Sequence, residues 1–173
     1  DYAAAYQDLG VAYSEQKQYK AAIDAFQQAL KLLPKSPAPH YNLGLVYLKQ
    51  GNFDEALLAL KRSIALGSDF VDAYNGLGEI YLKLGQFDEA MEAYSQANRL
   101  NPNLLSTHYG LGQVYAKKGQ YKGAIAAYQR VIEIEPDYPD AHYNLAQVYI
   151  KLGKKEGAAK AMERFEMLRK TDP

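Results

Sequence analysis

The chain has 173 residues, 48% of them hydrophobic, and its 20 Lys and Arg residues balance its 20 Asp and Glu residues. A neutral net charge gives no electrostatic argument for binding to nucleic acid or to an anionic membrane. Because the sequence contains no cysteine, it excludes disulfides, thiolate metal sites and cysteine catalysis. No apolar run in it approaches the length of a membrane span.

Residues 3–36 contain two groups of apolar and small residues at helical spacing. The first group is Tyr6, Leu9, Gly10 and Tyr13, and the second is Ala22, Phe26 and Ala29, followed by Pro34. Two apolar faces separated by a short polar break predict a helical hairpin, in which neither helix is stable alone. Any side chain larger than that of glycine at position 10 would push the two helices apart, and we expect Ala22 to face this glycine.

The same pattern recurs with a fixed period along the chain. The pair Leu9-Gly10 is followed at constant spacing by Leu43-Gly44, Leu77-Gly78, Leu111-Gly112 and Leu145-Ala146, and a tyrosine lies three residues after each pair. The predicted repeats are 3–36, 37–70, 71–104, 105–138 and 139–172. A fixed period of this length indicates a stack in which each repeat contacts only its neighbours.

These residues resemble the tetratricopeptide repeat (TPR) family, whose W-x2-L-G-x2-Y…A-x3-F…A…P signature and 34-residue length they match. The resemblance covers nearly the whole chain and identifies no individual member. It implies an all-α fold, a right-handed α-solenoid of five antiparallel helix-turn-helix hairpins with a concave groove. Residues 1–173 would then be a single array.

Two repeats depart from the pattern. In the second, Gly67-Ser68 replaces the usual Asp-Pro or Glu-Pro, and we expect Gly67 to end its helix in a left-handed conformation with a looser junction. In the fifth, Ala146 replaces the glycine, Met162 replaces an aromatic residue, and Phe165 fills a position that a following repeat would need small. Its second helix is also more polar, as a terminal repeat requires, so we expect 139–172 to cap the array.

Motifs for catalysis or metal binding are weak. His40, His108 and His142 hold the same repeat position, and stacked helices lie roughly 8–10 Å apart, which is too far for two imidazoles to share a zinc ion. Packing histidines are therefore favoured. The Gly-x-Gly pairs at residues 76–78 and 110–112 lack the third glycine and the strand of a phosphate loop. We predict no enzyme activity, no cofactor and no metal.

Function is therefore expected on a surface. In proteins resembling the TPR family, the first helix of each repeat lines a groove that receives a peptide. The positions that line it here combine aromatic, amide and aliphatic side chains with a lysine at one edge. The predicted peptide-binding residues are Tyr41, Asn42, Leu45, Leu48, Lys49, Asn75, Glu79, Leu82, Lys83, Tyr109, Gln113, Lys117, Tyr143, Asn144, Gln147 and Lys151.

The favoured function is a non-catalytic scaffold for protein–protein interaction and complex assembly, which binds a peptide or protein segment carrying apolar anchors and some acidic residues. A self-assembling structural module, and hence a homo-oligomer, is the alternative. An RNA-binding helical repeat ranks lower because the chain is neutral, so no nucleic-acid partner is expected. The lysines also have a simpler explanation, since they would keep exposed helix ends soluble.

The start of the chain suggests an origin within a longer array. Asp1-Tyr2 hold the place that Asp137-Tyr138 hold between the fourth and fifth repeats. A targeting segment, an anchor or a catalytic domain upstream could have been removed. A cytoplasmic location is favoured on this sequence, which contains no membrane span.

Overall fold

The structure is a computed structural model that describes residues 2–67 and 70–171. These residues form ten α-helices and no strand, which confirms the predicted all-α fold. The helices are α1 (Tyr2–Glu15), α2 (Tyr19–Leu32), α3 (Pro37–Gln50), α4 (Phe53–Leu66), α5 (Val71–Lys83), α6 (Phe87–Leu100), α7 (Leu105–Lys117), α8 (Tyr121–Ile134), α9 (Pro139–Lys151) and α10 (Lys155–Thr171). They fall into two compact units, an N-terminal unit (Asp1–Leu84) and a C-terminal unit (Gly85–Pro173).

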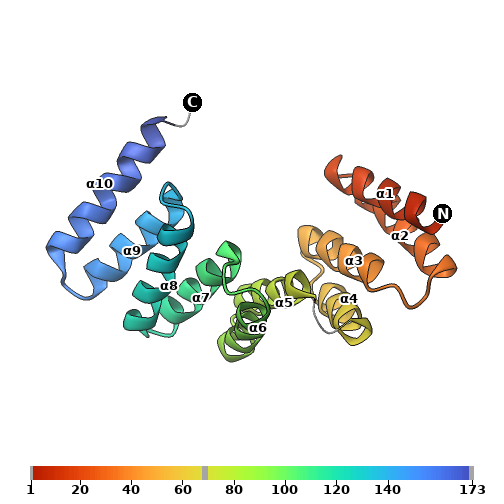
Figure 1. The fold of residues 1–173 in the computed structure, drawn as a ribbon, viewed down its shortest axis with the longest axis horizontal. Helices are drawn as coiled ribbons and strands as arrows, with labels where there is room; N and C mark the ends of the chain where they lie inside the picture. The colour runs from red at the N-terminus through yellow and green to blue at the C-terminus, as the bar shows by residue number, and fades with distance from the viewer. Residues whose placement is uncertain (1, 68–69, 172–173) are drawn as a thin grey trace. The chain divides into compact units, whose positions relative to one another are not determined.

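In the N-terminal unit, α1 pairs with α2 and α3 pairs with α4, each pair joined by a short connection (Figure 1). Helix α2 packs on α3, and α4 packs on α5. The first helices of successive repeats also touch, α1 with α3 and α3 with α5. This row of first helices carries the predicted peptide-binding residues of the unit.

The C-terminal unit repeats this packing. Helix α7 pairs with α8, and α9 pairs with α10 (Figure 1). Helix α6 packs on α7, and α8 packs on α9. The division into five repeats, the right-handed superhelix and the continuous groove concern the whole array and stay predictions.

Each first helix is followed, within two residues of its end, by a residue with positive φ, which lets the chain reverse into the second helix. Gly51, Gly85, Gly119 and Gly153 have φ of 70–78°, and Lys17 takes the same position in the first repeat with φ of 59°. At Gly51, the N–H groups of residues 51 and 52 donate to the carbonyls of residues 48 and 47. A left-handed residue at this place closes the helix, and glycine adopts that conformation without strain.

Small residues let the two helices of a hairpin approach closely. A Cβ atom at Gly10 would lie 2.5 Å from Cε1 of Phe26, and one at Gly44 would lie 2.6 Å from Cδ2 of Leu60. The predicted role of Gly10 is thus supported, but the side chain that faces it is Phe26, one helical turn beyond Ala22. Phe26 and Leu60 are fully buried, so they cannot move aside.

Small residues also let successive hairpins pack closely against each other. Gly76 on α5 faces Leu60 of the preceding hairpin, where a Cβ would lie 3.0 Å from Cδ1. Gly110 on α7 faces Tyr94 of α6, and a Cβ there would collide with the tyrosine ring. Both glycines are buried. The position that they share is therefore a contact between hairpins.

The end of the second repeat differs from its prediction. Gly67 has φ −159° and ψ 108°, an extended conformation that any residue adopts, so the expected left-handed conformation is wrong. Its N–H donates to the carbonyls of Ser63 and Ile64, which closes α4 without a left-handed residue. The buried hydroxyl of Ser63 donates to the carbonyl of Pro37 at 2.9 Å and ties α4 to α3. Ser68, the other residue of the predicted loose junction, lies outside the described residues.

The last hairpin differs from the others in the burial of its second helix. Ala146 on α9 is buried together with Ala158 and Ala161 on α10. Met162 and Phe165 on α10 are only partly buried. At the equivalent positions of the other described repeats, the side chains of residues 26, 60, 94 and 128 and of residues 29, 63, 97 and 131 are buried.

Candidate functional site

In the N-terminal unit, nine of the predicted residues lie on the neighbouring helices α3 and α5. Leu45 and Leu48 on α3 and Leu82 on α5 are partly exposed. Two positions before Leu45, Leu43 is buried in the core, and Leu77 is buried on α5. The first helices therefore keep aliphatic side chains accessible on one face while burying those on the opposite face. Val11, at the position of Leu45 in the first repeat, extends this set to α1, with 38% of its surface exposed.

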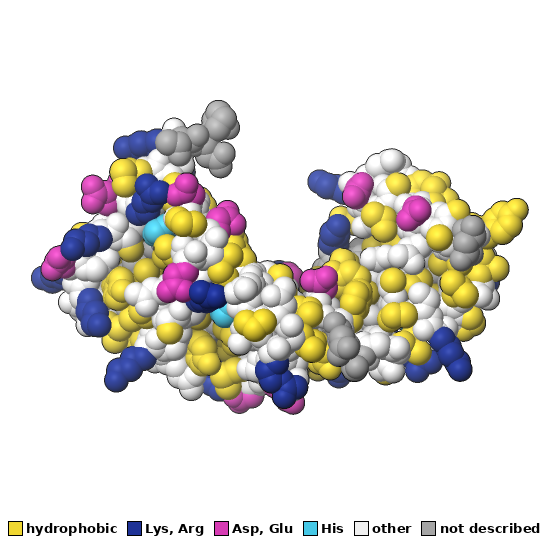
Figure 2. Space-filling view, in the orientation of Figure 1, with side chains coloured by type: hydrophobic (Ala, Val, Ile, Leu, Met, Phe, Trp, Pro, Cys, Tyr) yellow, Lys and Arg dark blue, Asp and Glu magenta, His cyan; other side chains and the backbone are white. Residues whose placement is uncertain are grey.

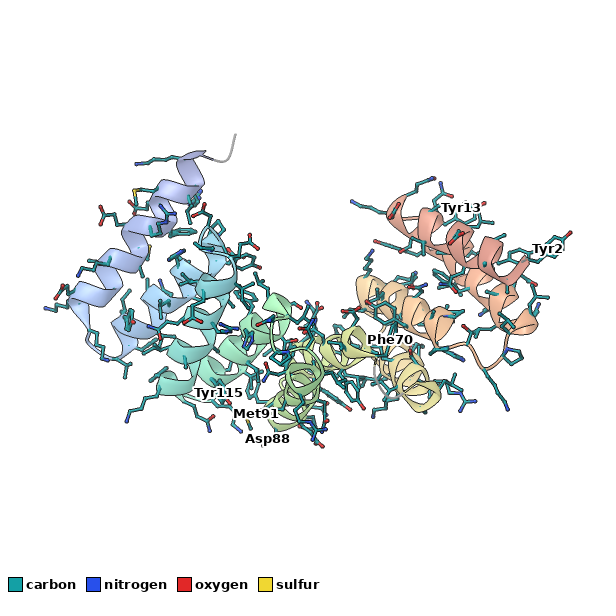
Figure 3. All side chains as sticks on the ribbon, in the orientation of Figure 1. Tyr2, Tyr13, Phe70, Asp88, Met91 and Tyr115 are labelled. Carbon is teal, nitrogen blue, oxygen red and sulfur yellow. The ribbon has the colours of Figure 1, made fainter. Side chains whose placement is uncertain are left out.

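The predicted tyrosines are packed against other aromatic rings. Tyr41 meets Phe70 edge to face, with ring centroids 4.7 Å apart and an interplanar angle of 81°. Tyr109 meets Tyr138 in the same way at 5.4 Å and 69°. Figure 3 labels Phe70 beside the start of α5. These tyrosines therefore join the first helix of one repeat to the connection that enters the next.

These aromatic pairs were not predicted, although the spacing of the aromatic residues in the sequence indicates them. Phe70 and Tyr138 are both the last residue of a predicted repeat, and each follows its tyrosine at the same separation along the chain. Tyr143 in the fifth repeat has Phe165 of α10 as its partner instead, at 5.1 Å. The guanidinium of Arg169 lies 5.5 Å from the centroid of that phenylalanine ring.

Burial changes the titration of two of these tyrosines. It raises the pKa of Tyr41 to about 12, and the negative charge of Asp72 adds to this effect. Burial also raises the pKa of Tyr109, again with a contribution from a carboxylate, that of Asp140. Both phenols are therefore neutral hydrogen-bonding groups at neutral pH.

Asn144, one of the asparagines predicted to hold a ligand's backbone, already has a partner. Its side-chain amide donates to the hydroxyl of Tyr109 at 2.9 Å. This bond links α9 to α7 within the C-terminal unit. The side-chain amide of Asn42, at the same repeat position, is partly exposed and forms no hydrogen bond with the described part of the chain. Of the two asparagines, Asn42 is therefore better placed to bind a ligand.

The lysines at the ends of the first helices remain in solvent. Lys83 lies 3.5 Å from Glu79, one turn earlier on α5, and both side chains are about half exposed. An exposed pair of this kind contributes little to stability. Lys49, Lys117 and Lys151 are exposed as well. On the face in Figure 2, Lys and Arg side chains are scattered over each unit and form no continuous patch.

The remaining predicted residues lie on the same faces. In the N-terminal unit, Asn75 and Glu79 are partly exposed on α5. In the C-terminal unit, Gln113 and Gln147 are partly exposed on α7 and α9. Ile150, one turn beyond Gln147, leaves 55% of its surface in solvent.

Two of the histidines form hydrogen bonds to the connections between repeats. Nε2 of His108 lies 2.7 Å from the carbonyl oxygen of Pro102, and Nε2 of His142 lies 2.8 Å from that of Pro136. A carbonyl only accepts hydrogen bonds, so Nε2 is the donor in both cases. His40 differs, because burial and the nearby Arg62 charge lower its pKa. The described residues contain no group of three or more His, Asp or Glu side chains suited to a metal ion.

One further exposed face, on α1, was not predicted from the sequence. Leu9 leaves 42% of its surface exposed, whereas its equivalents at residues 43, 77, 111 and 145 leave 6–9%. Ala5 is exposed, although the residues at its position in the later repeats are buried. Tyr6, Leu9 and Tyr13 line a hollow of about 260 Å³ with residues of α2. None of the helices in the described ranges is long and apolar enough to cross a membrane.

Comparison with known proteins identifies the family. Profiles described as "TPR repeat" match residues 10–51 and 112–153, and profiles described as "Tetratricopeptide repeat" match residues 41–104 and 139–172. No significant match is found among curated protein sequences.

Among solved structures, MamA is similar with 26% identity and a TM-score of 0.85, over 97% of this chain and 92% of MamA. TTC0263, a thermophilic TPR protein of Thermus thermophilus, has 27% identity and a TM-score of 0.77, over 98% and 93% of the two chains. YrrB, titled a TPR protein with an unusual peptide-binding site, has 23% identity and a TM-score of 0.79, over 96% and 86%. From these profiles and the helical hairpins described above, the chain belongs to the tetratricopeptide repeat family.

Proposed function

We propose that this protein is a non-catalytic scaffold that binds a segment of another protein on the face formed by the first helices of its repeats. The observation that carries the proposal is the row of accessible aliphatic side chains in the N-terminal unit, Val11, Leu45, Leu48 and Leu82, on helices that pack side by side. Apolar groups kept in solvent on one face of a folded unit are typical of an interaction surface. YrrB, a similar TPR protein described as having an unusual peptide-binding site, agrees with this proposal.

The chemistry of the face indicates what a bound segment would contain. The aliphatic row would hold two or three apolar anchor residues, and the amide of Asn42 is free to bond with the backbone of the segment. Lys49 lies next to Leu48 and would favour an acidic residue of the segment. Lys83 contributes less to this preference because Glu79 lies within 3.5 Å of it.

The test uses peptides selected against the whole chain from a random display library. We expect Leu48→Asp to weaken binding of the selected peptides at least about tenfold, because it places a charge in the apolar row. Leu58→Asp is the matched control, since Leu58 is 74% exposed on the second helix α4. Equal binding by the wild type and Leu48→Asp would contradict the proposal.

The lysine edge needs a separate variant. A protein with Lys49, Lys83 and Lys117 all changed to Glu should bind acidic selected peptides more weakly, and the affinity of the wild type should fall as salt is raised. Unchanged affinity and unchanged salt dependence would reject the acidic part of the partner and leave the apolar anchors in place.

Self-assembly of these 173 residues is a second candidate, suggested by the exposed face around Leu9, which an upstream repeat of a longer array would cover. We infer that a second copy of this chain would cover this face with its α10, as α8 covers α9 inside the C-terminal unit. Met162 and Phe165 on α10 are partly exposed at positions that are buried elsewhere, so the two faces match in kind. Such a contact is head to tail and could continue from copy to copy.

Light scattering after size-exclusion chromatography tests this contact over a range of protein concentrations. We expect a mass that rises with concentration, and we expect Leu9→Lys to abolish the rise while Leu58→Lys leaves it unchanged. A monomer at every concentration would reject self-assembly.

A further inference from the structure

An arrangement of three side chains occurs once in each compact unit, at the same repeat positions. In the N-terminal unit it comprises Tyr41 on α3, Phe70 before α5, and Asp72 in the first turn of α5. In the C-terminal unit it comprises Tyr109 on α7, Tyr138 before α9, and Asp140 in the first turn of α9. The separations along the chain, from the tyrosine to the second ring and from the tyrosine to the aspartate, are identical in the two copies.

Each aromatic pair is followed by a carboxylate in the first turn of the next helix, Asp72 on α5 and Asp140 on α9. The two rings pack edge to face in both copies, at 4.7 and 5.4 Å between centroids. Each aspartate lies two positions beyond the second ring. Burial is the main cause of the raised pKa of the tyrosine phenol, and the charge of the aspartate adds to it. Both aspartates are exposed, while the aromatic side chains are partly exposed. A charge entering from solvent can therefore reach both the carboxylate and the rings.

These carboxylates form no ion pair within the described chain, as is true of most of its acidic residues, and are therefore open to a cation from outside. Asp88 pairs with Lys118, and Asp137 pairs with Arg164. Within residues 2–67 and 70–171, no lysine, arginine or histidine forms an ion pair with Asp72 or Asp140. The first turn of a helix favours an acidic residue, but that preference does not require a tyrosine on the first helix of the preceding repeat.

The hairpin fold does not require this arrangement. The first repeat has Gln7, Ser36 and Ala38 at the three positions, and the third repeat has Asn75, Leu104 and Ser106. Both repeats contribute helices with the same bounds within the repeat, to within a residue or two. In the first four repeats, the tyrosine, the second ring and the aspartate are therefore present together or absent together, which indicates a joint role beyond packing.

We propose that each copy of this arrangement binds a cationic side chain, an arginine or a lysine, of the partner segment. The carboxylate forms the ion pair, and the exposed part of the aromatic pair contacts the flat face of a guanidinium or the methylenes of a lysine. The inference rests on the proposed segment-binding function and adds a specificity to it. A segment that uses this face would carry basic residues for the two aspartates, besides apolar residues for the aliphatic row.

The test titrates the full chain with N-acetyl-arginine amide and with its neutral counterpart, N-acetyl-citrulline amide, at fixed ionic strength. Assigned ¹H–¹⁵N spectra report on the two copies separately, through the amides of Ala73 and Ala141 beside the aspartates. We expect saturable shifts at both amides with the arginine derivative and none with the citrulline derivative. Equal responses to the two compounds would overturn the proposal.

The two copies serve as controls for each other. Asp72→Asn should weaken binding at Ala73 about fivefold, as expected for loss of about 1 kcal/mol, and leave Ala141 unchanged. Asp140→Asn should do the reverse. A variant that failed to fold would alter both signals and the whole spectrum, so it cannot imitate this result. Unchanged binding at the substituted copy would overturn the assignment.

A second measurement separates this inference from the scaffold proposal. Peptides selected by display should be enriched in Arg or Lys. Asp72→Asn should weaken the binding of these peptides, whereas Leu58→Asp should leave it unchanged. Selected peptides that depend on Leu48 but contain no basic residue would overturn the cation site and leave the scaffold proposal intact. Binding of the arginine derivative without any selected peptide would reject the scaffold proposal alone.

Discussion

At the residue scale, the repeats act as controls for one another, because a side chain can be compared with its equivalents in the other repeats. Lys17 is such a case. Among the described residues, Lys17 alone has a positive φ without being a glycine, and the later repeats have glycine at its position. The left-handed conformation costs an ordinary residue of the order of 1 kcal/mol. The first hairpin therefore folds against a local strain that the others avoid.

We predict that Lys17→Gly raises the free energy of unfolding by about 0.5–1 kcal/mol, because glycine adopts φ of 59° without strain. Urea unfolding followed by circular dichroism measures the change. Gly51→Ala is the matched control, and it should destabilise by a similar amount, since a Cβ at Gly51 meets no neighbour within 4 Å and only the backbone is affected. A Lys17→Gly protein no more stable than the wild type would contradict the strain.

Asn98 is a second residue that departs from its equivalents. Its side-chain oxygen is buried without a hydrogen-bond partner in the described chain, and the equivalent residues are Leu30, Ile64 and Ile132 in the other inner hairpins and Glu166 in the last one. An unsatisfied buried oxygen costs about 1–3 kcal/mol. We predict that Asn98→Ile increases the free energy of unfolding by about 1 kcal/mol, measured by thermal and urea unfolding. Asn98→Asp, which keeps the shape and adds a charge, should destabilise. An Asn98→Ile protein less stable than the wild type would show that the amide has a partner in solution.

At the scale of the helix pair, close packing couples one small residue to one large residue. A Cβ at Gly112 would lie 2.5 Å from Cε1 of the buried Tyr128 ring. In the last hairpin the corresponding pair is Ala146 and Met162, where the added methyl is matched by an unbranched, flexible side chain. The departure of the fifth repeat is thus a compensated change in its core, in addition to any role as a cap.

A double-mutant cycle tests this coupling. Gly112→Ala alone should destabilise by about 1–3 kcal/mol through overpacking against Tyr128. Tyr128→Met should also destabilise, because it removes a buried ring. The double variant should be more stable than the sum of the two single effects allows, with a coupling of about 1 kcal/mol measured by urea unfolding. Additive effects would mean that the glycine and the ring are independent.

At the scale of the whole molecule, each hairpin is stabilised by its neighbours. Leu60 shows how, since it contacts Gly44 within its own hairpin and Gly76 on the next. A defect at such a residue removes packing from two hairpins at once. Stability in a stack of this kind is approximately a sum over repeats and their interfaces, so the effect should fade with distance along the chain.

We predict that Leu60→Ala, with an expected cost of about 2–5 kcal/mol, lowers amide protection most strongly in α3, α4 and α5. Hydrogen exchange detected by mass spectrometry, with peptides covering both compact units, gives the comparison. Helices α8 to α10 should lose much less protection. Leu58→Ala on the same helix is the control, because its side chain is largely in solvent. Equal loss of protection over the whole chain would show a single cooperative unit.

The sequence alone determined the all-α fold, the repeat period and the hairpins, because each depends on local spacing of apolar residues and on glycines that recur at fixed places. It also placed Leu45, Leu48 and Leu82 on the face of the first helices that remains accessible. It misjudged Gly67, whose conformation depends on the two carbonyls that its N–H finds in α4 rather than on its own freedom.

Only the tertiary structure decided which predicted binding residues are already engaged within the fold. Tyr41, Tyr109 and Asn144 were predicted from their repeat position as groups available to a ligand, yet two are packed against other rings and the third donates to Tyr109. The exposure of Leu9 and the neighbourhood of Asp72 were equally absent from the local pattern. The physical reason is that a period fixes which residues are equivalent, whereas a side chain's partner lies in the next repeat, across a packed interface.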